Sequence, residues 1–400
     1  MSRQIVLSGP VAAAARAKLL AAARDAAPVT GLTHGYYKYP ARFSPSVART
    51  AIELFTAPGE LVLDPFMGGG TSVVEAISLG RRVVGNDVNS LAVYIARVKT
   101  TALSKRARGE ISAWVEAVGE HLSYRTVSPR VSASRADRRA KNLGIPRARA
   151  IKKLIALAMD SSNSLSCISA RSFARAIVLN VGQWALNGRR EPVTASAFRA
   201  RLRDVGSEML EASLPLPPTE SDPSAAQCVL YLGAAAHLPR KPCFRAGAKA
   251  DLVVTSPPYP GIHVLYHRWQ VDGRRESPAP YWIVDRTDGR GNAFYNFADR
   301  RDLTYDKYFA ALRLNMEAVR SVLRPGGTIV QVVALPSNEG LLGRFLRVMS
   351  EVGFSEIRFM GSRGTLHHRI RRRVPGRRWY TAHRGSAAGA VEVVLLHKAI

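Results

Sequence analysis

Short apolar runs alternate with helically spaced apolar positions over most of the chain. Each run is bounded by glycine, proline or polar residues, as buried strands are. The predicted strands fall at 61–64, 82–87, 229–232, 250–255, 328–334, 355–360 and 391–397. The predicted helices fall at 46–55, 72–79, 91–99, 305–323 and 340–352. Strands that alternate with helices predict an α/β fold, with a mainly parallel sheet covered on both faces.

The middle of the chain has a different pattern. Residues 101–225 contain no glycine loop and no strand pattern, and a proline-rich stretch at 214–225 is typical of a linker. Helical patches lie at 111–118, 150–159, 173–186 and 198–210. We therefore predict an inserted helical domain, which divides the chain into 1–105, 106–225 and 226–400.

Residues 250–259 form a strand that stops at two prolines, which cannot continue a central ladder. Ser256 and Tyr259 are thereby left at the carboxyl edge of the sheet, where open α/β sheets bind ligands. The Ser256 hydroxyl and the Pro257 carbonyl are potential acceptors, and Tyr259 offers an aromatic face. This set suits a planar base with an exocyclic amine, although a plain Pro-Pro turn with a packed tyrosine fits the same residues.

A glycine loop follows the first sheet strand, which ends at Asp64. Glycines let the backbone approach a ligand and expose amides at the start of a helix. No Gly-Lys-Ser/Thr follows, so the loop is not a phosphate-binding Walker loop. The next strand ends at Asp87, 23 residues on, where a ribose hydroxyl pair is usually held. A helix N-cap is the simpler role for the same aspartate.

These segments together resemble the DNA methyltransferases that modify exocyclic amino groups. Residues 255–259, Thr-Ser-Pro-Pro-Tyr, look like the catalytic motif, in which serine goes mostly with cytosine N4 and aspartate with adenine N6. Residues 64–71 resemble the cofactor loop, and 39–43 resemble the segment that closes the methionine end of S-adenosylmethionine. The resemblance implies a Rossmann-like S-adenosylmethionine-dependent methyltransferase sheet with an inserted helical domain.

The resemblance also implies roles for individual residues. The catalytic residues would be Ser256, Pro257, Pro258 and Tyr259. The cofactor-binding residues would be Tyr39, Pro40, Arg42, Phe43, Asp64, Pro65, Phe66, Gly68, Gly70, Thr71, Asp87 and Asn89. Ala234 departs from the pattern, because family members often have an acid there that contributes to the adenine site.

The chain is strongly basic, with 58 Lys and Arg against 30 Asp and Glu. Such a charge favours a polyanion, with nucleic acid first, although genomic composition can also enrich arginine. The insert has its densest basic cluster between Arg135 and Lys153, and 361–384 holds eight arginines and no acid. We predict that both contact DNA phosphates; a solvated helical face is the alternative for the insert. Residues 260–275 interleave aromatics with positive charge, as base-stacking surfaces and cores both do.

Cys167, Cys228 and Cys243 are scattered and form no close Cys/His pairs, which argues against a disulfide framework and against a metal site. No apolar run approaches the length of a membrane span. We expect a bacterial-type cytoplasmic, nucleoid-associated protein that acts on double-stranded DNA, with a restriction or defence partner and no membrane.

Three other functions fit the same residues. Serine predicts cytosine imperfectly, so an adenine-N6 DNA methyltransferase is the nearest alternative. An RNA methyltransferase would have the same sheet and glycine loop. A non-catalytic DNA-binding regulator with this fold is favoured by one feature, the missing acid at Ala234.

Overall fold

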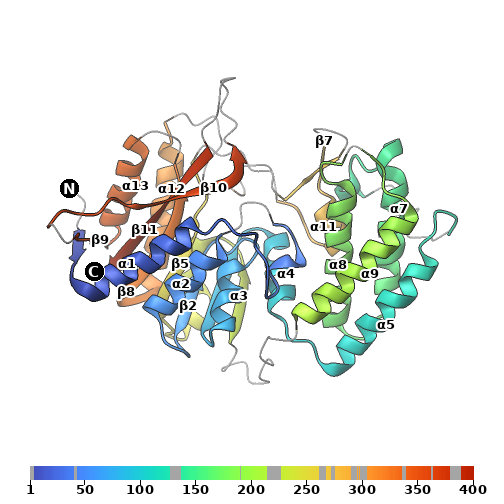
Figure 1. Ribbon diagram of the computed structural model, residues 1–400, viewed down its shortest axis with the longest axis horizontal. Helices are drawn as coiled ribbons and strands as arrows, with labels where there is room; N and C mark the ends of the chain where they lie inside the picture. The colour runs from blue at the N-terminus through green and yellow to red at the C-terminus, as the bar shows by residue number, and fades with distance from the viewer. Residues whose placement is uncertain are drawn as a thin grey trace.

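The protein forms an α/β lobe and a helical lobe that stand side by side (Figure 1). The computed structural model describes residues 4–39, 43–126, 137–189, 191–213, 227–260, 267–271, 275–289, 295, 297, 304–335, 339–361, 364–378 and 389–400.

The α/β lobe is built on one sheet, whose described strands follow the order β1-β9-β11-β8-β5-β2-β3-β4, with β10 paired to β11. Neighbours are parallel except around β11, which is antiparallel to β8, β9 and β10. The bounds are β1 Gln4–Leu7, β2 Leu61–Asp64, β3 Arg82–Asp87, β4 Cys228–Leu232, β5 Ala250–Thr255, β8 Leu323–Ala334, β9 Phe354–Phe359, β10 Ile370–Arg378 and β11 Gly389–Ala399. The predicted Rossmann-like α/β fold is confirmed.

Helices cover both faces of this sheet, because alternate residues of each strand point to opposite sides. Val62 and Val254 pack against α1, α2 and α3, whereas Leu63 and Val253 pack against α12 and α13. The bounds are α1 Gly9–Arg24, α2 Pro45–Phe55, α3 Thr71–Ser78, α4 Ser90–Thr100, α10 Pro242–Arg245, α12 Asp306–Val322 and α13 Glu339–Glu351, with short 3-10 turns at His34–Tyr36 and Ala235–Arg240. None of the described helices is long and apolar enough to cross a membrane.

The chain order changes direction between β2 and β5. From β2 the chain adds β3 and, after the helical insert, β4 on one side, and it then adds β5 and β8 on the other. The loops that leave β2 and β5 therefore diverge and open a crevice at the carboxyl ends of these strands. Both segments that the sequence singled out, 64–71 and 255–259, follow these two strands.

The helical lobe confirms the four predicted helical patches, whereas the three-part division of the chain stays a prediction. Its core also takes in a segment from beyond the insert: Trp269 is buried there and donates from Nε1 to the Tyr37 hydroxyl at 3.0 Å. Trp269 is therefore a core residue and not a base-stacking surface. The lobe contains α5 Lys105–His121, a 3-10 turn Arg138–Ala140, α7 Pro146–Ser162, α8 Ile168–Leu186, α9 Ala195–Ala212, β6 Trp269–Val271, β7 Arg275–Ser277 and α11 Ala279–Val284.

Two local expectations change. Strand β8 begins at Leu323 and not at 328, because 325–327 form an irregularity inside the strand, with Gly326 at a φ of 70°. Part of the arginine-rich stretch 361–384 is a strand, β10, and not a loop. The predicted linker at 214–225 lies outside the described residues.

Several of the basic residues counted in the sequence serve the fold itself. Arg369 donates to both carboxylate oxygens of Glu356, which is 2% exposed. In the insert, Arg139 binds Asp137 and also Asp285 at the end of α11. These arginines are paired within the protein, so the number of basic residues in a segment overstates the positive charge that it can offer to DNA.

Candidate active site

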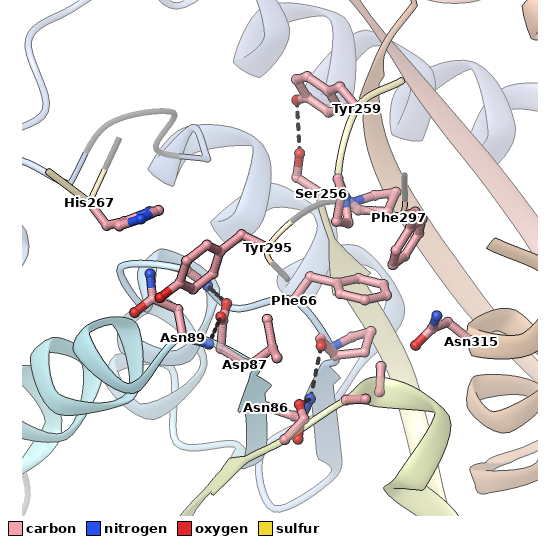
Figure 2. Close-up of a pocket in the computed structure, with 18 of the residues that line it drawn as sticks. Phe66, Asn86, Asp87, Asn89, Ser256, Tyr259, His267, Tyr295, Phe297 and Asn315 are labelled. Atoms are coloured by element: carbon pink, nitrogen blue, oxygen red, sulfur yellow. Dashed lines mark hydrogen bonds between the residues drawn. The ribbon is translucent and has the colours of Figure 1, made fainter. Parts of the chain in front are cut away.

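A cavity of about 260 Å³ opens at the carboxyl ends of β2, β3 and β5 (Figure 2). It lies at the crevice that the strand order predicts for this fold. Residues of both 64–71 and 255–259 line the cavity, together with residues that follow later in the sequence, such as His267 and Asn315. Its lining comprises Tyr39, Pro65, Phe66, Gly68, Asn86, Asp87, Val88, Asn89, Gly233, Ala234, Ala235, Ser256, Pro257, Pro258, Tyr259, His267, Tyr295, Phe297 and Asn315.

The glycine loop after β2 is packed too closely for larger residues. A Cβ at Gly69 would lie 2.8 Å from the Tyr39 Cβ, and one at Gly70 would lie 2.9 Å from the Ala96 Cβ. Real Cβ atoms do not approach that closely. Lys99, fully buried on α4, donates from Nζ to the Gly69 carbonyl at 2.8 Å and holds the loop from below. The loop is therefore fixed between Tyr39 above and α4 beneath.

Asp87 braces the same loop from the tip of β3. Its Oδ2 accepts from the Gly68 amide and its Oδ1 from the Asn89 amide, each at 2.8 Å. Burial raises the pKa of the Asp87 carboxyl to about 6, against the effect of the hydrogen bonds from these amides. Above that pH, Asp87 presents a carboxylate to the cavity.

Asp64 has a structural position behind the cavity wall. Its Oδ1 accepts from the Thr255 hydroxyl at 2.7 Å and from the Phe66 amide at 3.1 Å, and its Oδ2 accepts from the Ser72 hydroxyl. Burial raises its pKa to about 6 as well. One side chain thus ties the end of β2 to the start of α3 and to the end of β5, which couples the glycine loop to the Thr-Ser-Pro-Pro-Tyr segment.

Ser256 lies on the opposite wall of the cavity. Its Oγ donates to the Val332 carbonyl of β8 at 2.9 Å and lies 2.8 Å from the Tyr259 hydroxyl. The Tyr259 hydroxyl donates to Glu392 Oε1 at 3.1 Å, and the Tyr308 hydroxyl donates to the Pro258 carbonyl at 2.9 Å. The strand end is therefore fixed by hydrogen bonds as well as by its prolines.

An aromatic wall closes the cavity on the helical-lobe side. The His267 ring contacts the Tyr295 ring in a tilted arrangement, with centroids 4.1 Å apart, and the Tyr281 hydroxyl donates to Asn89 Oδ1 at 2.9 Å. Burial lowers the pKa of His267 to about 4, so this ring is neutral at physiological pH. The Tyr295 hydroxyl donates to Asp288 at 2.7 Å. This wall lines the cavity with the aromatic rings of His267, Tyr295 and Phe297.

The remaining wall follows β4, where Ala234 stands in place of the usual acid. Asn86 Nδ2 donates to the Gly233 carbonyl at 2.9 Å and to the Pro65 carbonyl at 3.2 Å, which fixes the orientation of the amide. Among the described residues the Asn86 Oδ1 has no hydrogen-bond partner, although the residue is buried. An unsatisfied acceptor therefore lies beside the position where the acid is missing.

The structure brings most of the predicted site residues together. Ten of them line the cavity: Tyr39, Pro65, Phe66, Gly68, Asp87, Asn89, Ser256, Pro257, Pro258 and Tyr259. Asp64, Gly70 and Thr71 lie behind its lining, Phe43 packs against the α1–α2 core, and Pro40 and Arg42 lie outside the described residues.

Sequence reasoning missed several lining residues, including Asn86, His267, Tyr295, Phe297 and Asn315. Two of them carried a signal. Asn86 is a polar residue inside the apolar run of β3, and Asn315 lies on the apolar stripe of α12 between Leu312 and Met316. A polar side chain within a buried pattern needs a partner and often marks a site.

The model of the N6/N4 DNA methylase family matches residues 23–98, which include Tyr39, the glycine loop and Asp87. Residues 23–98 are therefore similar to the amino-directed DNA methyltransferases. Type II methyltransferase M.MvaI of Kocuria varians is 41% identical over 75 residues, 18% of this chain and 16% of that protein. Type II methyltransferase M.MjaII of Methanocaldococcus jannaschii is 32% identical over 66 residues, 16% of this chain and 12% of that protein. The aligned part is therefore a small share of both relatives.

Among solved structures, TrmN from Thermus thermophilus is similar with a TM-score of 0.35 and 13% identity, over 92% of this chain and 52% of that one. The family match ends before 250–259, so the role of Ser256 depends on its place in the cavity.

The cofactor of this methyltransferase family is S-adenosylmethionine, and the cavity residues fit it. Asp87 presents a carboxylate suited to ribose hydroxyls, and Gly68 brings the backbone of the loop to the cavity lining without a side chain. Val88 and Ala235 supply apolar surface for a purine ring, and the Asn86 side chain, whose buried Oδ1 has no partner among the described residues, lies beside them. A carboxylate beside apolar surface suits the nucleoside part of this cofactor.

Lys99→Met is expected to weaken binding of S-adenosylmethionine about tenfold, or ~1.4 kcal/mol. The substitution keeps the buried stem of the side chain but removes the ammonium that holds the Gly69 carbonyl. Isothermal titration calorimetry measures the effect, with Lys105→Met at the exposed start of α5 as the matched control. Unchanged affinity in Lys99→Met would show that the loop holds its shape without this contact.

Proposed function

We propose that the protein is a DNA methyltransferase that moves a methyl group from S-adenosylmethionine to the exocyclic amine of a flipped base, cytosine N4. One observation carries the proposal. Ser256 at the end of β5 and the glycine loop at the end of β2 line the same cavity, at the point where the strand order changes direction. The proposed acceptor for the amine and the proposed site for the methyl donor therefore share one cavity.

Methyl transfer to an aromatic amine requires hydrogen-bond acceptors that are placed around the amino group. An aromatic amino nitrogen is a poor nucleophile because its lone pair is delocalised into the ring. Acceptors for both amino hydrogens favour a pyramidal nitrogen and release the lone pair. The Ser256 Oγ and the Pro257 carbonyl are proposed for this task, since both residues line the cavity.

Positioning supplies most of the remaining rate enhancement. S-adenosylmethionine contributes an activated methyl group, and displacement at its carbon must be in line. The bracing of Ser256 by Val332 and of Pro258 by Tyr308 holds the strand end in one geometry. Such fixed orientation is worth several kcal/mol in reactions of this kind, up to about 7–11 in the best cases.

A base within a duplex cannot reach this cavity, so the proposal requires flipping at a cost of a few kcal/mol. Stacking on Tyr259 and on the His267–Tyr295 wall is proposed to offset that cost, at about 1–3 kcal/mol per stacked base. The net charge of +28 favours the DNA backbone. Arg149 on α7 and Arg371 on β10 are exposed and are proposed as phosphate contacts.

The helical lobe is proposed to contribute target recognition. It supplies His267 to the cavity and continues from there into α11. We also propose a restriction or defence partner, which the type II names of the two relatives support. Association with the nucleoid is proposed as well.

The test is transfer of labelled methyl. The protein is incubated with methyl-tritiated S-adenosylmethionine and unmethylated duplex DNA, the DNA is digested to nucleosides, and the labelled nucleoside is identified. We expect N4-methyldeoxycytidine. Label on N6-methyldeoxyadenosine would reassign the base, label only on RNA would reassign the substrate, and cofactor binding without any transfer would leave a DNA-binding regulator.

A further inference from the structure

A buried carboxylate lies behind the Thr-Ser-Pro-Pro-Tyr segment, in a position that the proposed reaction has not used. Glu392 belongs to β11 and is 3% exposed. Its Oε1 accepts from the Tyr259 hydroxyl at 3.1 Å, and its Oε2 accepts from Arg372 Nη1 at 2.8 Å. Arg372 lies directly opposite Glu392 on β10. A chain of contacts thus runs from the arginine-rich strand to Ser256.

The direction of the protons along this chain follows from its two ends. An arginine side chain only donates, and a carboxylate paired with it only accepts. Tyr259 therefore gives its single hydroxyl proton to Glu392, and its oxygen is left as an acceptor toward Ser256 at 2.8 Å. The Val332 carbonyl, 2.9 Å from the Ser256 Oγ, is also an acceptor. The one Ser256 proton is thus shared between two acceptors, the Val332 carbonyl and the Tyr259 oxygen, and neither neighbour donates to the Ser256 lone pairs.

We propose that Glu392 is a positioning residue that sets the direction of this hydrogen-bond chain and thereby keeps Ser256 an acceptor for the target amine. The inference rests on the proposed function and extends it to a residue outside the family-like segments. Without the carboxylate, the Tyr259 proton would turn to the Ser256 Oγ and occupy a lone pair that the amine requires.

Glu392→Gln is expected to reverse the direction of donation along this hydrogen-bond chain, because glutamine has nearly the same shape as glutamate but carries an NH₂ donor. Arg372 only donates, so it holds the carbonyl oxygen of the new amide, and the NH₂ group faces Tyr259. Tyr259 must then accept from Gln and donate to Ser256. We expect kcat for methyl transfer to fall about tenfold or more, with the KM values for DNA and cofactor within about twofold.

Two further variants separate positioning from a general structural effect. In a Tyr259→Phe background the hydroxyl is absent, so Glu392→Gln should change kcat by less than about twofold, as coupled residues do in double-mutant cycles. In an Arg372→Met background the donor that fixes the amide oxygen is removed, so the double variant should recover activity relative to Glu392→Gln alone. Independent, multiplicative losses in both cycles would overturn the proposal.

A measurement without turnover tests the chain separately from the reaction. Tyrosine labelled with ¹³C at Cζ gives one resonance per residue, and Tyr259→Phe identifies that of Tyr259. We expect this resonance to shift in Glu392→Gln in the absence of DNA and cofactor, and to return toward its wild-type position when Arg372→Met is added. An unmoved resonance in a folded variant refutes the inference even for an active enzyme. If the wild type transfers no methyl group, the proposed function fails, and the role assigned to Glu392 fails with it, whatever the resonance does.

Discussion

Ser256→Ala is expected to lower kcat for methyl transfer by about 10²- to 10³-fold, the range seen when one preorganised hydrogen-bonding group is removed from a catalytic site. The Ser256 Oγ lines the cavity and is the proposed side-chain acceptor for the amine, which alanine would remove. The affinity for DNA should stay within about twofold of wild type, because one hydroxyl contributes little to a charge-driven interface. Single-turnover kinetics and a DNA-binding titration measure the two quantities.

Ser90→Ala is the matched control. The Ser90 hydroxyl also donates to a backbone carbonyl, that of Thr287 at 2.7 Å, but Ser90 does not line this cavity. Its loss should leave kcat near the wild-type value. Parallel losses of turnover and DNA binding in Ser256→Ala would contradict the assigned role, since they would indicate a damaged fold.

The ends of the sheet strands could be predicted from sequence because local chemistry determines them. An apolar run that stops at Asp64, at Asp87 or at Pro257 leaves its last polar group at the carboxyl edge, wherever the strand lies in the sheet. Parallel pairing then brings these ends together. The predicted core of the site needed no knowledge of long-range contacts.

The aromatic wall could not be predicted in the same way. His267 and Tyr295 reach the cavity because the segment that carries them leaves β5, joins the core of the helical lobe and returns. Trp269 and Tyr281 fix that path by packing in the lobe. Which side chains face the cavity therefore depends on how two lobes dock, and no spacing within 260–300 contains that information.

Charge counts alone could not show which arginines reach DNA. The arginines of 361–384 predict a surface for DNA, but Arg369 and Arg372 pair with the buried carboxylates of Glu356 and Glu392. A sequence shows the sum of charges but not which acids are buried opposite them. Glu392 left a local signal, since it is an acid inside the apolar run 391–397.

Asp87→Ala should weaken S-adenosylmethionine binding by about 10- to 100-fold, because hydrogen bonds to a charged acceptor are worth about 1.5–3 kcal/mol. The variant removes the carboxylate that faces the cavity and also the acceptor that braces the Gly68 amide. Calorimetry measures the affinity, with Asp204→Ala on the exposed face of α9 as the control. Unchanged affinity would rule out a ribose contact.

The pH dependence supplies a second test of the same residue. Burial raises the pKa of Asp87 from 3.8 to about 6, so the carboxyl gains a proton as the pH falls through 6. The ligand hydroxyls favour the carboxylate, and wild-type affinity should therefore decline below pH 6 and be constant above it. Asp64 titrates in the same range but lies behind the cavity lining. Asp87→Asn keeps Asp64 intact, so a profile that flattens in this variant assigns the dependence to Asp87, whereas an unchanged profile assigns it to Asp64.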